Sequence, residues 1–383
     1  MTEKIVFLCG SLEPGRDGVG DYTRKLAGGL IARGHLASVI AINDKYIPET
    51  STVLQQDNGT EVEVLRIPAS IDWKAKALLA ETYIKKINPE WISLQYVSYA
   101  YQPKGMPLKM VQAFAGLLGK YKLQIMFHEL WLGEKKNAAL KARIYGFLQK
   151  KIIQSLLRKA NPLVIQTSIP LYQKILSNHG IKAGVLPIFS NISDLKLPYD
   201  TYAGDIPEWL VKDRKDFVIG CNFGSFYQES WDLASLLVPF AAACKKIGKR
   251  PLIYSIGKIS AGEKEWKELA AVYPEITFLT VGICSQEMIS YWLTYFTDFG
   301  IITTPAFIAG KSGSFMAFKA HGLYCFCKEN DLEFDFGVQE IGFDKSLVLI
   351  KSEADFYIPE RTSATNQLDD TMKIFINSLN SSQ

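Results

Sequence analysis

Short apolar runs alternate with helical segments along almost the whole chain, and this alternation leaves few folds open. The first run, at 5–9, is followed by a glycine-rich loop at 10–20, a helix at 22–33 and a second run at 37–42. Continuous apolar runs are typical of strands buried on both faces of a parallel sheet. Strand, helix and strand in series form right-handed crossovers in such a sheet. Further strands are predicted at 63–67, 91–96, 124–128 and 163–166.

A second alternation follows a segment rich in proline, serine and aspartate at 186–210, which is typical of an interdomain linker. Its predicted strands lie at 217–222, 251–256, 277–280 and 299–303. The length of 383 residues also favours two domains. We therefore expect an α/β protein with two Rossmann-like domains facing each other across a cleft. The expected bounds are 1–190 and 215–355 for the domains, 191–214 for the linker, and 356–383 for a helical tail that packs back on the first domain.

Composition predicts an ordered cytoplasmic protein, with 48% hydrophobic and 21% charged residues. No apolar stretch approaches the roughly 20 residues that cross a bilayer, and the run at 5–9 is too short for a signal peptide. The six cysteines lie mostly in apolar segments, which indicates free thiols in a reducing compartment. Cys325 and Cys327 lack partners at zinc-ligand spacing, so no metal site is expected.

The net charge of +4 hides a strongly basic region. Between Lys104 and Lys182 there are fourteen cationic residues and two acids, Glu129 and Glu134. Interleaved aromatic and apolar residues suit an anionic membrane surface or an anionic acceptor. A helix face solvated by lysines is the other interpretation.

A Gly310-Lys311-Ser312-Gly313-Ser314 turn precedes a helix of small residues near the C-terminal end. The N-terminus of such a helix is suited to a phosphate. A nucleoside-triphosphate P-loop would need glycine at position 305, which is proline. The turn therefore predicts an anion site of another kind.

The segment 10–35 resembles the N-terminal loop and first helix of GT-B glycosyltransferases, in particular the family 4-like group (glycosyl transferases group 1). Leu26-Ala27-Gly28-Gly29-Leu30 and Arg33-Gly34-His35 carry the likeness, which extends more weakly over nearly the whole chain. It implies that the C-terminal domain holds a nucleotide sugar and that the N-terminal domain holds the acceptor.

Candidate residues in the N-terminal domain follow predicted strands. In the glycine loop, Gly18 and Gly20 allow close backbone approach to a ligand, and the helix starting near Asp21 adds a positive end. A nicotinamide-dinucleotide site remains an alternative, because Asp44 ends the second strand, although the loop is too long for its fingerprint.

Phe127-His128-Glu129 closes the strand predicted at 124–128, where residues of a cleft would gather. His128 resembles the active-site histidine that touches the donor sugar, although a hydrogen-bonded core histidine is the other interpretation. Glu129 is a candidate base for an acceptor hydroxyl, but neighbouring strand residues point to opposite faces. The expected acceptor cleft is lined by Tyr96, Tyr99 and Tyr101.

In the C-terminal domain the resemblance places the donor diphosphate after the first strand, where the expected Arg and Lys are absent. Gly224 and Ser225 still offer hydrogen bonds, while Lys258 and Lys311 are the candidate charges beside Gly310, Ser312, Gly313 and Ser314. Two glutamates of the family fall on Ala309 and Ala317. A rewritten donor loop and a non-catalytic relative both fit this departure.

These features predict a glycosyltransferase that moves a sugar from a nucleotide-diphosphate sugar to a hydroxyl acceptor in cell-surface glycan or glycolipid synthesis. No Asp-x-Asp motif is present, so neither a metal nor a cofactor besides the co-substrate is expected. The resemblance favours retention of configuration, which the missing glutamates leave open. The alternatives are a degenerate sugar-nucleotide or glycan binder and an NAD(P)-dependent oxidoreductase. The expected partners are a nucleotide sugar, a glycan or lipid-linked acceptor and the inner face of a membrane, with no nucleic acid.

Overall fold

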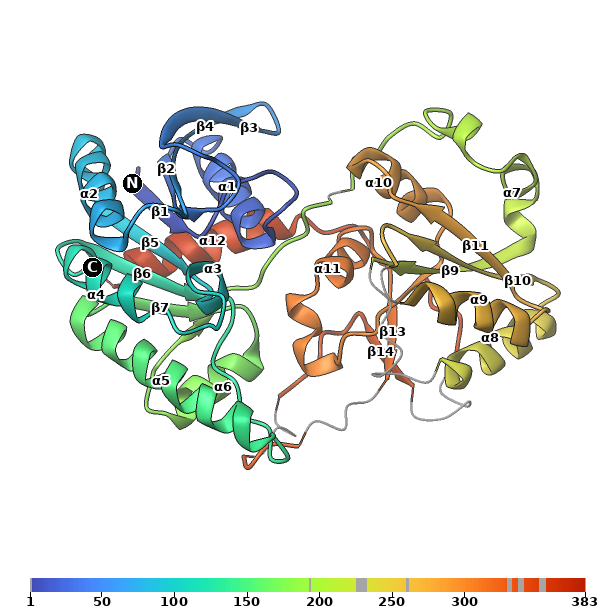
Figure 1. Cartoon of the computed structure of the whole chain (residues 1–383). Coiled ribbons are helices and arrows are strands. Elements are labelled where there is room, and N and C mark those ends of the chain that lie inside the picture. Colours follow the sequence, from blue (N-terminus) through green and yellow to red (C-terminus); the bar gives the residue numbers. More distant parts are fainter. Residues whose placement is uncertain are drawn as a thin grey trace. The chain divides into compact units, whose positions relative to one another are not determined.

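The computed structural model describes residues 2–192, 194–224, 233–259, 262–328, 333–336, 341–350 and 356–382. They divide into two compact units, each built around its own sheet (Figure 1). Unit 1 comprises 1–188, 332–340 and 368–383, and unit 2 comprises 189–331 and 341–367. Among the described residues, no helix combines the length and apolar character that a membrane crossing requires.

Unit 1 contains an eight-stranded sheet in the order β3-β4-β2-β1-β5-β6-β7-β8. All neighbours pair in parallel except the β3–β4 hairpin, which the sequence pattern did not reveal. The inner strands are almost continuously buried, as parallel strands covered by helices must be. The strands are β1 Lys4–Cys9, β2 Leu36–Asp44, β3 Ser51–Asp57, β4 Thr60–Pro68, β5 Trp91–Tyr96, β6 Lys122–Phe127, β7 Val164–Thr167 and β8 Gly184–Val185.

Helix boundaries in unit 1 follow local capping chemistry. Asp72 accepts hydrogen bonds from the first backbone N–H groups of α2, and Asn88 ends that helix in the left-handed region. Asn161 ends α5 in the same way. The helices are α1 Gly18–Ile31, α2 Trp73–Ile87, α3 Ser98–Tyr101, α4 Leu108–Leu118, α5 Leu140–Ala160 and α6 Pro170–Asn178, with α12 Gln367–Asn380 from the C-terminal end.

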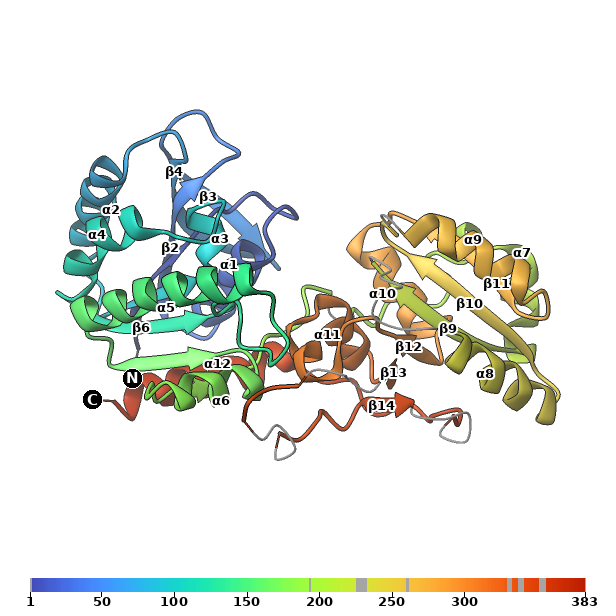
Figure 2. The ribbon, with the colours of Figure 1, turned by 60° about the horizontal axis from the view of Figure 1, so that its bottom comes forward.

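Helix α12, drawn in red in Figures 1 and 2, packs in unit 1. Phe375 and Leu379 are buried, and the Phe375 ring stacks on Phe7 of β1 with 5.7 Å between centroids. Arg33 at the end of α1 forms an ion pair with Asp369. The last helix of the chain thus completes the core around the first strand.

Unit 2 contains a six-stranded parallel sheet in the order β11-β10-β9-β12-β13-β14. The strands are β9 Phe217–Phe223, β10 Arg250–Ile256, β11 Thr277–Gly282, β12 Phe299–Ile301, β13 Cys325–Lys328 and β14 Leu347–Ile350. The helices are α7 Glu208–Asp213, α8 Ala234–Lys246, α9 Glu263–Val272, α10 Gln286–Tyr295 and α11 Gly313–Ala320, with short 3-10 turns at Ala203–Asp205, Arg214–Asp216 and Ala306–Lys311. Two parallel sheets with crossover helices confirm the predicted α/β class with two Rossmann-like domains.

The segment predicted as a linker is largely packed against unit 2. Tyr199 makes an edge contact with Tyr295 of α10, with ring centroids 5.2 Å apart, and its carbonyl accepts a hydrogen bond from Tyr291. Ile206 and Leu210 are buried. Aromatic side chains therefore hold a stretch whose prolines and turns indicated an open connection.

A buried lysine ties α2 to the end of β2. Lys76 is 1% exposed, and its Nζ donates to Asn43 Oδ1 at 2.6 Å and to the Ala69 carbonyl at 3.1 Å. The ammonium also lies 4.3 Å from the Trp73 ring centroid. Burial lowers the pKa of Lys76 from 10.5 to about 8, because the charged form loses its hydration.

The free energy of unfolding should therefore rise with pH, because the pKa of Lys76 is lower in the folded protein than in the unfolded chain. Between pH 8 and 10.5 the unfolded chain holds a proton on Lys76 that the folded protein has released, so alkaline pH favours folding. We expect the gain relative to Lys76→Met to reach about 3 kcal/mol, at about 1.4 kcal/mol per pKa unit. Urea unfolding of both proteins at pH 7 to 10 measures it. Parallel stability curves would contradict the lowered pKa.

Candidate active site

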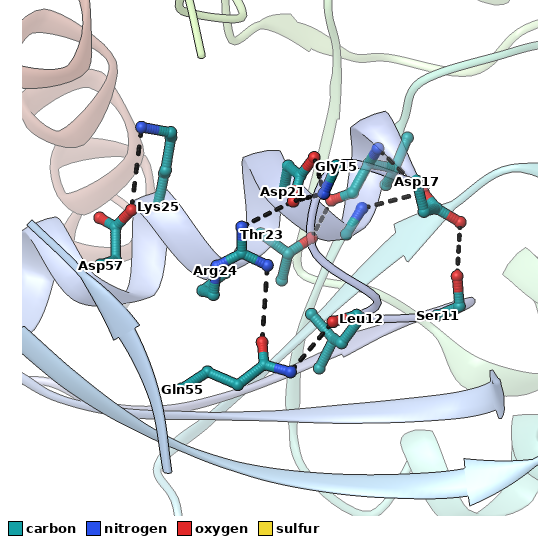
Figure 3. A network of polar contacts seen from close by, with 12 residues as sticks. Ser11, Leu12, Gly15, Asp17, Asp21, Thr23, Arg24, Lys25, Gln55 and Asp57 are labelled. Carbon is teal, nitrogen blue, oxygen red and sulfur yellow. Dashed lines mark hydrogen bonds and ion pairs between the residues drawn. The ribbon is translucent and has the colours of Figure 1, made fainter. Parts of the chain in front are cut away.

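Polar groups of the loop between β1 and α1 and of the first turn of α1 form hydrogen bonds with one another (Figure 3). Asp17 caps α1: its Oδ1 accepts from the backbone N–H groups of Val19 and Gly20, each at 3.0 Å. Its other oxygen accepts from Ser11 Oγ at 2.9 Å. The helix begins at Gly18, so Gly18 and Gly20 lie in its first turn and not in a loop as predicted. The Asp17 carboxylate thus occupies the N-terminus of α1, where a ligand was expected.

Asp21 and Gly20 serve the same internal packing. The Asp21 carboxylate accepts from the Gly15 N–H at 3.1 Å and pairs with Arg24 at 2.6 Å. A Cβ on Gly20 would lie 2.2 Å from the Ser11 carbonyl oxygen. Glycine is thus required at position 20 because the chain at Ser11 passes close over α1. This packing explains the glycine without the predicted ligand.

Asp44 at the end of β2 is fully buried and paired. Its Oδ2 accepts from Arg66 Nε at 2.7 Å and from the Leu12 N–H at 3.2 Å. Oδ1 accepts from the Tyr46 N–H. The carboxylate that a dinucleotide ribose would require is therefore already used, which weighs against the nicotinamide alternative.

His128 lies immediately after β6, at the carboxyl edge of the first sheet, and is 7% exposed. Since β6 ends at Phe127, strand alternation does not separate His128 from Glu129, which is half-buried. The Tyr22 and His128 rings form a T-shaped contact, with centroids 5.0 Å apart. His128 Nε2 lies 2.8 Å from Gln95 Oε1.

A buried chain of hydrogen bonds extends from Gln95, the partner of His128, across the first sheet. Ser93 Oγ donates to Gln124 Oε1 at 2.6 Å and accepts from Gln95 Nε2 at 2.7 Å. Gln124 in turn donates to Gln166. This order places Gln95 Oε1 beside His128 Nε2, an arrangement in which Nε2 donates and Gln95 accepts.

Two polar residues at this edge escaped the sequence analysis. Gln95 is buried within β5, and Ser168 follows β7 in register with His128, because Phe127 pairs with Thr167. Ser168 is buried, and its Oγ has no hydrogen-bond partner among the described residues. Serine and glutamine inside apolar strands carry no motif, so only the pairing of β5, β6 and β7 brings them to His128.

The three tyrosines predicted for an acceptor cleft separate by burial. Tyr96 and Tyr101 are buried, and their rings pack 5.8 Å apart. The Tyr101 hydroxyl donates to the Gln95 carbonyl at 2.7 Å, and burial raises the pKa of Tyr96 to about 12. Tyr99 is exposed and accepts a hydrogen bond from Gln149 of α5. Tyr96 and Tyr101 are thus core residues that support β5, and Tyr99 alone of the three presents its ring to solvent.

In unit 2 the carboxyl edge of the sheet carries glycines with left-handed backbone. Gly224, Gly257 and Gly282 follow or end β9, β10 and β11, each with φ of 84°. The Gly224 N–H donates to the Ile256 carbonyl, and the Gly257 N–H donates to the Gly282 carbonyl. This edge therefore presents backbone with little side-chain cover, and the exposed Lys258 follows Gly257 directly.

The Gly310–Ser314 turn reaches the same edge. It runs from the end of the 3-10 turn Ala306–Lys311 into the first residues of α11, so Gly313 and Ser314 are helical. It follows β12, which neighbours β9 at the point where strand order reverses. Ser312 caps α11 by accepting from the Phe315 N–H, and Ser314 Oγ donates to the Phe223 carbonyl at 2.7 Å. Gly224 and Ser314 are thus adjacent, Lys311 is half-buried, and Gly313 is exposed. Ser225 lies outside the described residues.

Ala309 and Ala317, where the family has glutamates, are both completely buried. A carboxylate in either place would lose its hydration, so these positions contribute packing and no charge. Across the described ranges, no three or more His, Cys, Asp or Glu side chains converge as metal ligands do. A cavity of about 290 Å³ is lined by cationic Lys135, Arg143 and Lys150 together with Leu132–Glu134, Gly146, Phe147 and Asp335.

Comparison with known proteins gives a likeness in structure only. No family model matches the chain, and no curated protein matches its sequence. An α,α-trehalose 6-phosphate synthase from Burkholderia multivorans superposes with a TM-score of 0.54 at 11% identity, covering 100% of this chain and 99% of that one. A UDP-forming α,α-trehalose-phosphate synthase from Burkholderia vietnamiensis gives 0.55 at 10% identity, with the same coverage.

This is the GT-B fold. The match spans both sheets, which confirms the resemblance first seen in residues 10–35 as one of architecture. In the GT-B framework the Gly224, Lys258 and Gly310–Ser314 candidates share one sheet edge, and His128 and Glu129 lie at the corresponding edge of the other sheet.

Proposed function

We propose that the protein is a glycosyltransferase that transfers a sugar from a nucleotide-diphosphate sugar to a hydroxyl acceptor. The observation that carries the proposal is the turn at the switch point of the second sheet, in a chain with the GT-B fold. Ligands of open α/β sheets bind at such points. The UDP-forming activity named for the Burkholderia vietnamiensis neighbour suits a uridine nucleotide as the first donor to test.

The donor diphosphate would be held by backbone donors and two lysines. The Gly313 and Ser314 N–H groups in the first turn of α11 and the Ser312 hydroxyl would supply hydrogen bonds. Gly310 and Ser225 would add to them, and Gly224 would contribute close backbone approach, because its N–H and the Ser314 hydroxyl already donate within the chain. Lys311 and Lys258 supply the charge that the absent Arg and Lys of the family would give. Neutralising the leaving diphosphate in this way stabilises the transition state without a metal or another cofactor.

His128 and Glu129 would act on the sugar and acceptor. His128 would contact the donor sugar from the sheet edge, with its ring held by the hydrogen bond between Nε2 and Gln95 Oε1. Glu129 would take the proton from the acceptor hydroxyl. The family resemblance favours retention of configuration. The acceptor would be a glycan or lipid-linked saccharide of the cell surface, reached from the cytoplasm at the inner face of the membrane.

Lys311→Ala should weaken donor binding without loss of stability. A charge-assisted hydrogen bond contributes about 1.5–3 kcal/mol, so the dissociation constant should rise about tenfold or more. Calorimetry with UDP-, GDP- and dTDP-sugars measures it, and urea unfolding should agree with the wild type within about 0.5 kcal/mol. Lys264→Ala, at an exposed position in α9, is the matched control. Equal donor affinity in Lys311→Ala would remove this residue from the site.

A catalytically degenerate binder is the second candidate, favoured by the buried alanines at 309 and 317. It predicts donor binding with neither donor hydrolysis nor transfer to any acceptor extract. A thermal shift caused by NAD(P), and not by nucleotide sugars, would instead favour the oxidoreductase. The pairing of Asp44 with Arg66 weighs against that alternative.

A further inference from the structure

We propose that the exposed face of α5 docks the protein on an anionic lipid bilayer. Four large apolar side chains lie on this face at helical spacing: Leu140, Ile144, Phe147 and Leu148 are 73%, 52%, 55% and 42% exposed. The buried residues of α5, among them Gln149, Ile153 and Leu156, lie on the opposite face by helical periodicity. Figures 1 and 2 show α5 as the long green helix along one side of unit 1. The helix thus has two apolar faces, one of which the described residues of unit 1 leave exposed.

The charge of α5 selects the partner. Its 21 residues include six cations and no acid. Lys151 and Arg158 lie on the docking face itself, Lys141 and Lys159 follow one edge, and Arg143 and Lys150 follow the other. An apolar stripe between rows of cations is the arrangement of helices that lie in a lipid interface. Each lysine or arginine near an anionic surface adds about 1 kcal/mol.

Nearby acids do not cancel this charge. Glu129 and Glu134 are the acids between Lys104 and Lys182. Glu134 is partly buried; it accepts from Trp131 Nε1, lies 3.0 Å from His179 Nε2 and lies 3.9 Å from Lys150 Nζ. The carboxylate is therefore held inside unit 1. Asp335 lies at the cavity beside Phe147, where Lys135, Arg143 and Lys150 outnumber the two carboxylates.

Long basic side chains are also placed to reach the lipid phosphates. Lys151 Nζ lies 5.4 Å from the Phe147 ring centroid and Lys141 Nζ lies 6.0 Å from that of Tyr145. Apolar stems along the helix with charged ends above them are typical of interfacial residues. The inference rests on the proposed function only for the purpose of docking, which is to present a lipid-linked acceptor. Bilayer binding itself requires no donor and no turnover.

Vesicle sedimentation tests the proposal. Wild-type protein should bind vesicles that contain about one third phosphatidylglycerol at least tenfold better than phosphatidylcholine alone, and added salt should weaken this binding. Lys141→Glu/Lys151→Glu should reduce binding about 30-fold or more, since two cations are lost and two acids gained. Leu140→Gln/Ile144→Gln/Leu148→Gln keeps every charge and should also lose most binding. Val272→Gln/Lys264→Glu in α9 is the matched control and should bind as the wild type does.

Thermal unfolding and donor affinity of each variant separate this result from the proposed function. Both should match the wild type, because the side chains substituted in α5 are exposed and belong to unit 1, whereas the donor turn belongs to unit 2. Equal binding to both vesicle types, or unchanged binding in both α5 variants, overturns the proposal. So does a wild-type dimer in solution that the Leu140→Gln/Ile144→Gln/Leu148→Gln variant abolishes, since the stripe would then be covered by a second copy.

Discussion

His128→Ala is expected to lower the rate of donor hydrolysis and transfer about a hundredfold or more, while the dissociation constant for the nucleotide changes less than about twofold. The reason is position: His128 follows β6 at the sheet edge, and the diphosphate candidates belong to a different sheet. Gln95→Leu should give a smaller loss, about tenfold, because it removes the hydrogen-bond partner that orients the His128 ring.

A double-mutant cycle distinguishes this role from general damage. His128→Ala/Gln95→Leu should be no slower than His128→Ala alone, since Gln95 acts through the ring that the first substitution removes. His179→Ala is the matched control; this half-buried histidine follows α6 and should retain wild-type turnover. Wild-type turnover in His128→Ala would rule out the proposed role, and additive losses would rule out positioning by Gln95.

Gly146→Ala should destabilise the protein by about 3 kcal/mol or more. A Cβ at 146 would lie 1.7 Å from the Leu132 carbonyl oxygen and 2.6 Å from its carbon, so either α5 or the 131–134 backbone must move. Urea unfolding measures the loss. Gly116→Ala is the matched control in a helix interior, because position 116 is exposed in α4 and a Cβ there meets nothing within 4 Å.

The control should change stability in the opposite direction. Alanine restricts the unfolded chain and favours helix, so Gly116→Ala should gain roughly 0.5–1 kcal/mol. Two Gly→Ala substitutions in neighbouring helices would then differ in sign. A loss below about 1 kcal/mol in Gly146→Ala would mean that the 131–134 segment is free to shift away from α5, against the close packing described here.

The sequence predicts the alternation of strands and helices well, because buried parallel strands are continuous apolar runs. It predicts β1, β5, β9 and β10 nearly to the residue. It does not reveal β3, whose exposed alternating side chains resemble a polar loop, or β13 and β14, which are four residues each. Strands this short depend on neighbours for their pairing, which local pattern does not encode.

One candidate segment can be recognised from residue type alone, and its role in binding stays a prediction. The Lys311–Ser314 turn needs only its own sequence to be recognised, and its contact with Phe223 follows from strand order. The glycine loop was predicted to approach a ligand with its backbone. Asp17, a good N-cap, precedes Gly18 and accepts hydrogen bonds from the Val19 and Gly20 N–H groups. Tyr96 and Tyr101 were predicted to line a cleft, but their rings are buried. This burial depends on β6, far along the chain, and local sequence does not show it.

The place of α12 has a consequence for biosynthesis. Phe375 and Leu379 complete the core that surrounds β1, so the first sheet made by the ribosome lacks its final cover until the last helix has emerged. Unit 2 is synthesised during that wait and contains its own core. The later unit can therefore mature first, while the earlier one exposes apolar surface around Phe7 that a holding chaperone would recognise.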